Sequence, residues 1–341
     1  MKTGILTTPG SGLNTMHATG QLGRVTRHFQ AYRDAGHALT YFSSLPDDRA
    51  WISDVRRPKK VLGFRGALTR PYWDSGLMEC DVLRVTNLAG SLTAITTHAA
   101  FGTPFVVSHG ADYEAIARIH GRPAWKWRWL RRLAFALCSA VIVPNPVQAA
   151  DLQRRFPRTR VVHVPNWVDT QLFRPERGAP ASGRRKVLYI GRLVKEKNLE
   201  RLAEVCATHN WKLICVGAGP LNRELWHRKA ECHGAIPWES LPLYHGWANV
   251  FCLPSFTEGH PKALLEAMSS GVPCAVSTGV TGLVTPGVDG LVFAPYDEPM
   301  MAKAIASVEP EHGRMARLTA ERYDIKRVMP QEIGLVREVA R

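Results

Sequence analysis

The amino-acid sequence predicts an α/β fold made of two doubly wound domains, each built on a parallel sheet. Short runs of β-branched and aliphatic residues, bounded by turn residues, alternate with longer helical stretches, as is typical of parallel sheets. These runs form two sets, and the stretch between them at 174–186 is rich in Pro, Gly, Ser and charge without an apolar period. A length of 341 residues also suits two domains better than one.

We expect a first domain at 1–170, a linker at 171–185 and a second domain at 186–341. Two such domains imply a cleft between them, and ligands of doubly wound sheets bind at the C-terminal ends of the strands. The last segment, 325–341, is predicted to be helical, and the sequence leaves open which domain it packs on. The expected strands lie at 3–8, 37–42, 60–64, 80–85, 104–109, 140–143 and 160–164, then at 186–191, 211–217, 249–254, 273–277 and 291–293.

The charge balance is strongly basic. The chain has 44 Lys and Arg against 29 Asp and Glu, a formal net charge of +15. Such a surplus attracts anionic partners such as nucleotides, lipid head groups or nucleic acid. An arginine-rich surface without a partner is the alternative.

Cysteine usage and apolar runs indicate the compartment. The seven cysteines form no Cys-x-x-Cys pair and most lie in apolar runs, which predicts buried thiols in a reducing environment. The N-terminal apolar stretch is too short for a signal peptide, and the longest apolar run, 133–144, falls short of the roughly 20 residues that span a bilayer. We therefore expect a cytoplasmic protein, at most peripheral at the inner face of the membrane.

The segment 255–273, SFTEGHPKALLEAMSSGVP, contains two glutamates eight positions apart, Glu258 and Glu266. Proline suits the first position of a helix and glycine suits the position after its end, so we expect a loop, a helix at 261–270 and a stop at Gly271. The N-terminus of a helix offers unpaired N–H groups to a phosphate. A phosphate flanked by two carboxylates suits a nucleotide sugar, whose hydroxyl groups the carboxylates can bind.

The alternative for this segment is a surface ion pair of Glu266 with Lys262 at i,i+4 spacing. That alternative does not account for Glu258, which precedes the helix. Upstream, Arg192 and Lys197 follow the expected strand at 186–191. Two cations at the C-terminal edge of a sheet suit a diphosphate, although cations at such positions are often simply solvated.

The order of these motifs resembles the C-terminal domain of the family-4 glycosyltransferases, retaining nucleotide-sugar transferases of GT-B fold with an E-x7-E motif. The similarity rests on Gly-Arg-x4-Lys, Val-Gly-x-Gly-Pro at 216–220, the E-x7-E pair and the segment 164–175, and covers about residues 160 to 295. It implies a GT-B architecture with an N-terminal acceptor domain and a C-terminal donor-nucleotide domain. Shorter segments at 217–237 and 277–293 leave the sugar and base of the donor open.

The resemblance also implies roles for matching residues. Arg192 and Lys197 would neutralise the donor diphosphate, Glu266 would bind the ribose, and Glu258 would bind the transferred sugar. The donor-binding residues that it implies are Gly12, Arg192, Lys197, Gly259, His260, Pro261, Lys262 and Glu266. The catalytic residues that it implies are His109 and Glu258.

The first half matches the family through its glycine-rich opening and through the segment 104–114. Gly10 and Gly12 would allow the backbone to approach the donor. In the family, the equivalent of His109 contacts the donor sugar near the reaction centre. The alternatives are a structural histidine and, for the nearby acid Asp112, a surface role instead of an acceptor-facing one.

No metal or other cofactor is expected. The sequence contains no Asp-x-Asp, no His-Glu-x-x-His and no Cys/His cluster at ligand spacing. Arg192, Lys197 and helix dipoles would therefore neutralise the leaving diphosphate in a metal-independent transfer.

The segment 121–140 interleaves aromatic and basic residues. This composition suits a helix at a membrane interface or a surface for single-stranded nucleic acid, and an ordinary helix with a solvated face is the alternative. The residues concerned are Trp125, Lys126, Trp127, Arg128, Trp129, Arg131 and Arg132.

We therefore predict a retaining glycosyltransferase whose partners are a nucleotide sugar and an anionic acceptor or surface. A lipid-linked or cell-envelope glycan is favoured as acceptor over a modified base in nucleic acid. A non-catalytic nucleotide-sugar binding module is the rival from another class, and the oligomeric state stays open.

Overall fold

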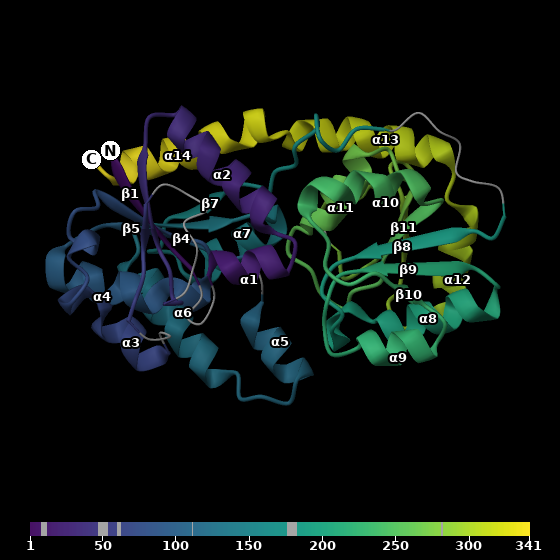
Figure 1. Cartoon of the computed structure of the whole chain (residues 1–341), viewed down its shortest axis with the longest axis horizontal. Coiled ribbons are helices and arrows are strands. Elements are labelled where there is room, and N and C mark those ends of the chain that lie inside the picture. The colour runs from purple at the N-terminus through teal and green to yellow at the C-terminus, as the bar shows by residue number, and fades with distance from the viewer. Residues whose placement is uncertain (8–11, 47–53, 60–62, 111, 176–182, 281) are drawn as a thin grey trace. The chain divides into compact units, whose positions relative to one another are not determined.

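The computed structural model describes residues 1–7, 12–46, 54–59, 63–110, 112–175, 183–280 and 282–341. It divides into two compact units, one of residues 1–164 with 329–341 and one of residues 165–328 (Figure 1). Of the expected linker, 171–175 and 183–185 belong to the second unit, and 176–182 lie outside the described residues.

The first unit contains a seven-stranded sheet in which the pairings between the described strands are all parallel. Its strand order is β3-β2-β1-β4-β5-β6-β7, so the order reverses beside β1, as in doubly wound folds. Its central strands are buried on both faces, which explains their continuous apolar runs. The strands are β1 (Lys2–Leu6), β2 (Ala38–Phe42), β3 (Val55–Arg56), β4 (Val82–Val85), β5 (Phe105–Ser108), β6 (Ala140–Val143) and β7 (Val161–His163).

Helices lie on both sides of this sheet. Figure 1 shows α2 and α14 on one side and α3, α4 and α6 on the other. The helices are α1 (Leu13–Ala18), α2 (Leu22–Asp34), α3 (Phe64–Thr69), α4 (Ser91–Phe101), α5 (Tyr113–Ile119), α6 (Trp125–Leu137) and α7 (Pro146–Arg155), with most of α14 (Ile325–Val339).

The second unit has a six-stranded sheet of order β10-β9-β8-β11-β12-β13. The pairings between its described strands are again parallel, and the order reverses beside its first strand, β8. The strands are β8 (Lys186–Ile190), β9 (Lys212–Val216), β10 (Glu231–Cys232), β11 (Val250–Leu253), β12 (Cys274–Ser277) and β13 (Leu291–Phe293). The helices are α8 (Leu199–Thr208), α9 (Asn222–His227), α10 (Leu241–Trp247), α11 (Lys262–Ser269), α12 (Glu298–Ser307) and α13 (Pro310–Ala320).

The predicted α/β class and two parallel sheets are thus confirmed, but the end of one expected strand is wrong. Of 60–64, the first three residues lie outside the described chain, and Phe64 begins helix α3. The third strand among the described residues is β3, which pairs Val55 with Tyr41 at the sheet edge. Like β10, it has only two residues, so it leaves no run of apolar residues in the sequence.

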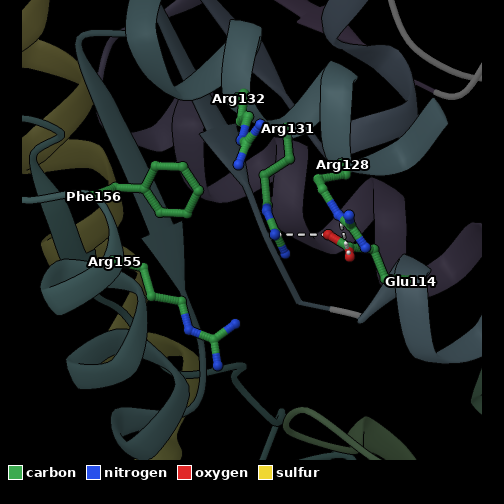
Figure 2. Close-up of a pocket in the computed structure, with 6 residues that line it drawn as sticks. All are labelled: Glu114, Arg128, Arg131, Arg132, Arg155 and Phe156. Carbon is green, nitrogen blue, oxygen red and sulfur yellow. Dashed lines mark hydrogen bonds and ion pairs between the residues drawn. The ribbon is translucent and has the colours of Figure 1, made fainter. Parts of the chain in front are cut away.

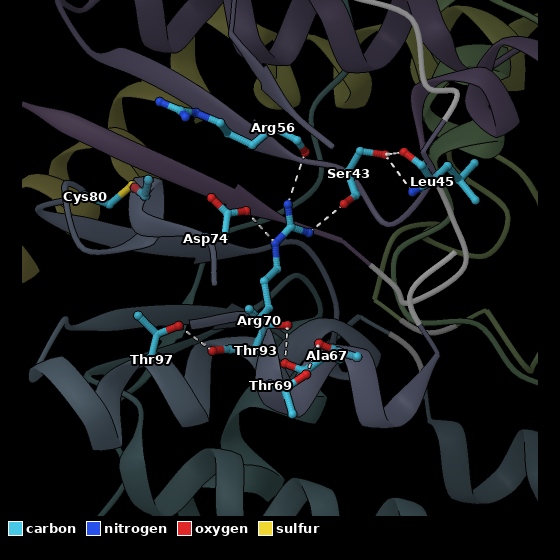
Figure 3. Close-up of polar contacts among 12 residues, drawn as sticks. Ser43, Leu45, Arg56, Ala67, Thr69, Arg70, Asp74, Cys80, Thr93 and Thr97 are labelled. Atoms are coloured by element: carbon cyan, nitrogen blue, oxygen red, sulfur yellow. Dashed lines mark hydrogen bonds and ion pairs between the residues drawn. The ribbon is translucent and has the colours of Figure 1, made fainter. Parts of the chain in front are cut away.

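A buried arginine fixes the edge of the first sheet (Figure 3). Arg70 donates from Nε to Asp74 Oδ2 at 2.9 Å, and its other nitrogens donate to the carbonyl oxygens of Ser43 at 2.5 Å and Arg56 at 3.1 Å. Its guanidinium also lies 5.1 Å from the centre of the Phe42 ring. Since Ser43 and Arg56 lie at the ends of β2 and β3, Arg70 joins both strands to the segment after α3.

The C-terminal helix packs on the first unit. Glu332 of α14 accepts hydrogen bonds from the Tyr32 hydroxyl at 2.8 Å and from Arg84 Nε at 2.9 Å, and all three side chains are buried. The sequence left the partner of this helix open. The buried contacts of Glu332 with Tyr32 and Arg84 show that it packs on the first unit.

The cysteines follow the prediction in part. All seven are free thiols, and Cys138 and Cys232 are half-buried instead of buried. The buried ones are Cys80, Cys206, Cys215, Cys252 and Cys274.

Candidate functional site

In the second unit, the candidate donor site is formed by loops at the C-terminal ends of β8, β9 and β11. Glycines allow the first two loops to pack against each other. Gly217 has a φ of +141°, and a Cβ there would lie 1.9 Å from the carbonyl oxygen of Gly191. Leu193 N also donates to Ala218 O at 3.0 Å, which holds the loop after β8 on the loop after β9.

Lys197 and Glu258 meet at this edge. Lys197 Nζ lies 2.5 Å from Glu258 Oε1, and Ser255 Oγ donates to the same oxygen at 2.8 Å. Both charged side chains are largely buried. The sequence analysis assigned these residues to different parts of the donor, and it did not predict their direct contact.

Arg192 lies in the same loop but remains exposed. Its Nη2 is 3.2 Å from Glu196 Oε1, and the Glu196 side chain is buried. The carbonyl oxygen of Glu196 accepts a hydrogen bond from Phe256 N at 3.0 Å, which ties the loop that contains Lys197 to the loop that contains Glu258. Arg192 therefore exposes its guanidinium group to solvent, while these contacts hold the loop that carries it in place.

Glu266 lies inside the unit. It is only 2% exposed, and it accepts a hydrogen bond from Trp238 Nε1 at 2.7 Å. The alternative of a surface ion pair with Lys262 is therefore wrong, because a surface pair requires an exposed carboxylate. Sequence reasoning missed Trp238, although a buried indole N–H generally needs an acceptor.

Helix α11 begins one residue later than expected. Pro261 caps the helix in an extended conformation, and Gly271 follows it with a φ of +71°, as predicted for a helix stop. The buried His260 packs edge-on against the Tyr323 ring at 5.2 Å, and its carbonyl oxygen accepts from Asn166 Nδ2 at 2.5 Å. Gly259 before it is also buried, whereas Lys262 is exposed.

In the first unit, His109 directly follows β5. Its backbone N–H donates to Ile142 O at 2.8 Å, and its buried ring packs edge-on against Phe135 at 5.5 Å. Burial, and then the positive charge of Arg131, lower the pKa of His109 to about 4. His109 is thus a neutral imidazole at pH 7.

Gly12 and Asp112 lie at helix starts. Gly12 is the N-cap of α1, and Gly10 lies outside the described residues. Asp112 is the N-cap of α5 and accepts hydrogen bonds from the backbone N–H groups of Glu114 and Ala115, each at 3.0 Å. The structure thus gives Asp112 a capping role, which an aspartate directly before a helix could have indicated.

The aromatic residues of α6 divide between surface and interior. Trp125 and Trp129 are 62% and 55% exposed, whereas Trp127 stacks on Tyr113 with ring centres 4.6 Å apart. Lys126 is exposed beside the Trp125 ring.

The arginines of α6 line a cavity of about 460 Å³ (Figure 2). Arg131 Nη2 lies 2.6 Å from Glu114 Oε1, and Arg128 Nε lies 3.3 Å from Glu114 Oε2. Sequence reasoning did not find Arg155 and Phe156, because these residues lie more than 20 positions after Arg128 in the chain. The lining residues are Glu114, Arg128, Arg131, Arg132, Arg155 and Phe156.

Within the described ranges, no helix has both the length and the apolar character needed to cross a membrane.

Two family models match the chain in succession. The model described as Glycosyltransferase Family 4 matches residues 22–172, and the model described as Glycosyl transferases group 1 matches residues 172–323. Together they cover residues 22–323, which include every described strand except β1.

Curated relatives match parts of the chain. A GDP-mannose-dependent alpha-mannosyltransferase of Corynebacterium glutamicum is 27% identical over 157 residues, which is 43% of this chain and 38% of that protein. A GalNAc-alpha-(1->4)-GalNAc-alpha-(1->3)-diNAcBac-PP-undecaprenol alpha-1,4-N-acetyl-D-galactosaminyltransferase of Campylobacter jejuni is 27% identical over 236 residues, which is 65% of this chain and 60% of that protein. The chain thus spans 38% to 60% of the length of these two relatives.

Solved structures share the fold over nearly the whole chain. Sucrose-phosphate synthase from Thermosynechococcus elongatus superposes with a TM-score of 0.83 at 19% identity, over 99% of both chains. The Anabaena protein HepE in complex with UDP-glucose gives a TM-score of 0.76 at 16% identity, also over 99% of both chains. At these identities the similarity shows the fold alone.

Proposed function

The chain belongs to the family-4 glycosyltransferases of GT-B fold, and from this premise we propose that it moves a sugar from a nucleoside-diphosphate sugar to an acceptor hydroxyl group with retention of configuration. One observation carries the proposal. Lys197 and Glu258, an anion-binding and a hydroxyl-binding side chain, lie 2.5 Å apart at the C-terminal edge of a doubly wound sheet.

In the proposed reaction, the bond between the anomeric carbon and the diphosphate oxygen breaks. A bond to the acceptor oxygen forms on the same face of the sugar, and the hydroxyl proton leaves with the nucleoside diphosphate. Arg192 and Lys197 neutralise the charge that develops on the leaving diphosphate. Glu258 binds hydroxyl groups of the sugar, and the neutral His109 contacts the sugar near the reacting carbon.

Binding of the nucleoside is assigned to Glu266. Its carboxylate is buried and oriented by Trp238, so it presents a fixed acceptor for ribose hydroxyl groups. The backbone of Gly259, His260 and Pro261, with the exposed Lys262, completes the proposed donor site of the second unit. In the first unit, the backbone at Gly12 is assigned to the donor as well. No metal ion or other cofactor is assigned a role, since Arg192 and Lys197 supply the positive charge.

For the acceptor, we favour a lipid-linked or cell-envelope glycan. The Campylobacter jejuni relative is named for a PP-undecaprenol saccharide, and the exposed Trp125 and Trp129 beside Lys126 suit the surface of an anionic membrane. On this proposal the protein works in the cytoplasm, peripherally at the inner face of the membrane. Binding to nucleic acid at the same helix is the outcome that would favour a modified base as acceptor instead.

The proposal is tested by a thermal-shift panel of nucleoside diphosphates and nucleotide sugars. A ligand at 100 times its dissociation constant stabilises the folded chain by about 2.7 kcal/mol, so a fitting base should stand out. Stabilisation by UDP or GDP that Glu266→Gln weakens supports the proposal. An equal response of all members of the panel, with inorganic diphosphate as strong as any nucleotide, would contradict it.

A further inference from the structure

A second cationic site lies in the first unit, on different elements from the proposed donor site. Four arginines and one glutamate line its cavity, so four positive charges and one negative charge leave a formal surplus of three. Arg128, Arg131 and Arg132 share a face of α6 through their i,i+3 and i,i+4 spacing. Arg155 comes from the last turn of α7. Figure 2 shows Arg131 and Arg155 extending into the same open space.

Ion pairing inside the protein does not account for this cluster. Glu114 pairs with Arg131 and Arg128, and Asp151 pairs with Arg155 at 2.9 Å, but no ion pair is recorded for Arg132 in the described chain. Arg131 is only 13% exposed, and its buried Nε has no hydrogen-bond partner among the described residues. The two carboxylates, Glu114 and Asp151, thus balance two of the four arginine charges, and a bound anion would neutralise the charge that remains.

The shape of the cavity indicates more than a bare ion. A volume of about 460 Å³ is in the range of small-molecule sites and exceeds the space that a single phosphate fills. One wall is the Phe156 ring, whose centre lies 5.5 Å from the Arg131 guanidinium carbon. The site thus combines planar donors for phosphate oxygens with an apolar wall for an attached organic group.

The cavity also adjoins the proposed reaction centre within the same unit. The Phe135 ring packs against both Phe156, at 5.1 Å, and His109, at 5.5 Å. A single aromatic ring therefore separates the wall of the cavity from His109.

We propose that the cavity lined by Arg128, Arg131, Arg132 and Arg155 binds a phosphate group of the acceptor, so that the acceptor is a phosphate ester whose hydroxyl group is presented toward His109. This inference rests on the proposed glycosyl transfer. The shared chemistry is an organic phosphate, which a soluble sugar phosphate or a lipid-linked phosphate can supply. Arg131 holds the phosphate from the buried side, and Arg155 holds it from the exposed side.

The inference is tested by calorimetric titration of the full chain with glycerol 3-phosphate. We expect one saturable site whose dissociation constant rises at least about tenfold in Arg131→Gln and in Arg155→Gln, since each removes a charge-assisted hydrogen bond. The matched control is Arg154→Gln, which removes the same charge from the same turn of α7 but does not line the cavity. It should stay within about twofold of the wild type.

Equal affinity in the wild type and in Arg155→Gln would overturn the inference, and so would an equal loss in Arg154→Gln. Because Arg155 is 61% exposed, its substitution gives a result even if Arg131→Gln does not fold. Vesicles carrying a polyprenyl diphosphate distinguish the two sources. Binding that glycerol 3-phosphate displaces identifies a lipid-linked acceptor, and glycerol 3-phosphate binding without vesicle binding identifies a soluble one.

Release of nucleoside diphosphate from a nucleotide sugar, measured in parallel on the wild type, separates this inference from the proposed function. Release without glycerol 3-phosphate binding overturns the phosphate site alone. Binding without release leaves the phosphate site in place and overturns the proposed glycosyl transfer.

Discussion

Lys197 Nζ lies 2.5 Å from Glu258 Oε1, although the two residues are 61 positions apart in the chain. Each suits a different part of a nucleotide sugar. The lysine can bind the diphosphate, and the glutamate can bind hydroxyl groups of the sugar. Without a donor they neutralise each other in a largely buried position. We expect a bound diphosphate to compete for Lys197 and so to free Glu258 for sugar hydroxyl groups.

Substitution of Glu258 should lower turnover. Glu258→Gln removes the charge that strengthens hydrogen bonds to the reacting sugar, so kcat should fall about 10- to 100-fold, equivalent to about 1.5–3 kcal/mol, with KM nearly unchanged. Steady-state kinetics measure this. The control is Glu239→Gln, an exposed glutamate of the same unit, which should leave kcat within about twofold. A rise in KM alone would contradict the role of Glu258.

Substitution of Glu266 should weaken nucleotide binding. The side-chain carbonyl in Glu266→Gln can still accept the hydrogen bond from Trp238, but the variant offers ribose hydroxyl groups no charged acceptor. The dissociation constant of the nucleoside diphosphate, measured by calorimetry, should rise about tenfold, while kcat changes little. The reverse split, with kcat reduced and affinity retained, would reassign Glu266 to the reacting sugar.

His109 should titrate well below an ordinary histidine. Its pKa of about 4 lies below the value of about 6.5 expected in the unfolded chain, so between these values the unfolded chain holds a proton that the folded chain lacks. Its contribution of up to about 3 kcal/mol to the free energy of unfolding is therefore present above pH 6.5 and is lost as the pH falls toward 4.

Histidine-selective NMR measures this pKa directly. Arg131→Gln should raise the pKa of His109, because it removes a positive charge that opposes protonation, whereas Arg154→Gln should not change it. A wild-type His109 that titrates near 6.5 would show that its ring is solvated.

Loss of the Glu332 charge should destabilise the chain. Glu332→Gln leaves the buried Arg84 without its carboxylate partner, and breaking such a pair costs about 3–5 kcal/mol. Denaturant unfolding measures the effect. Glu338 of the same helix gives the control, because its ion pair with Arg160 is exposed and Glu338→Gln should cost less than about 1 kcal/mol. Equal effects would mean that the buried pair contributes no more than a surface pair.

Transfer should continue in excess EDTA. Arg192 and Lys197 supply the positive charge that the leaving diphosphate requires, so removal of divalent ions should change kcat by less than about twofold. Loss of activity that magnesium or manganese restores would reveal a metal requirement.

The sequence predicted the parts of this protein that local patterns determine. Pro261 and Gly271 mark the bounds of α11 to within a residue, and long apolar runs locate the central strands. The edge strands β3 and β10 were missed because two residues make no pattern. Long-range pairings were also missed. Nothing near Glu266 in the sequence indicates Trp238. The arginines of α6 likewise do not indicate Arg155 and Phe156, which reach the same cavity from the C-terminal end of α7.

The most direct test of the central claim is release of nucleoside diphosphate from UDP- and GDP-sugars by the purified chain without an acceptor. We predict slow release from one donor by the wild type, and loss of that release in the double variant Lys197→Met/Glu258→Gln. Because both partners of the ion pair are removed together, neither charge is left alone in the folded chain. Saturable binding of a nucleotide sugar without any release would instead identify a binding module and contradict the assignment of a glycosyltransferase activity.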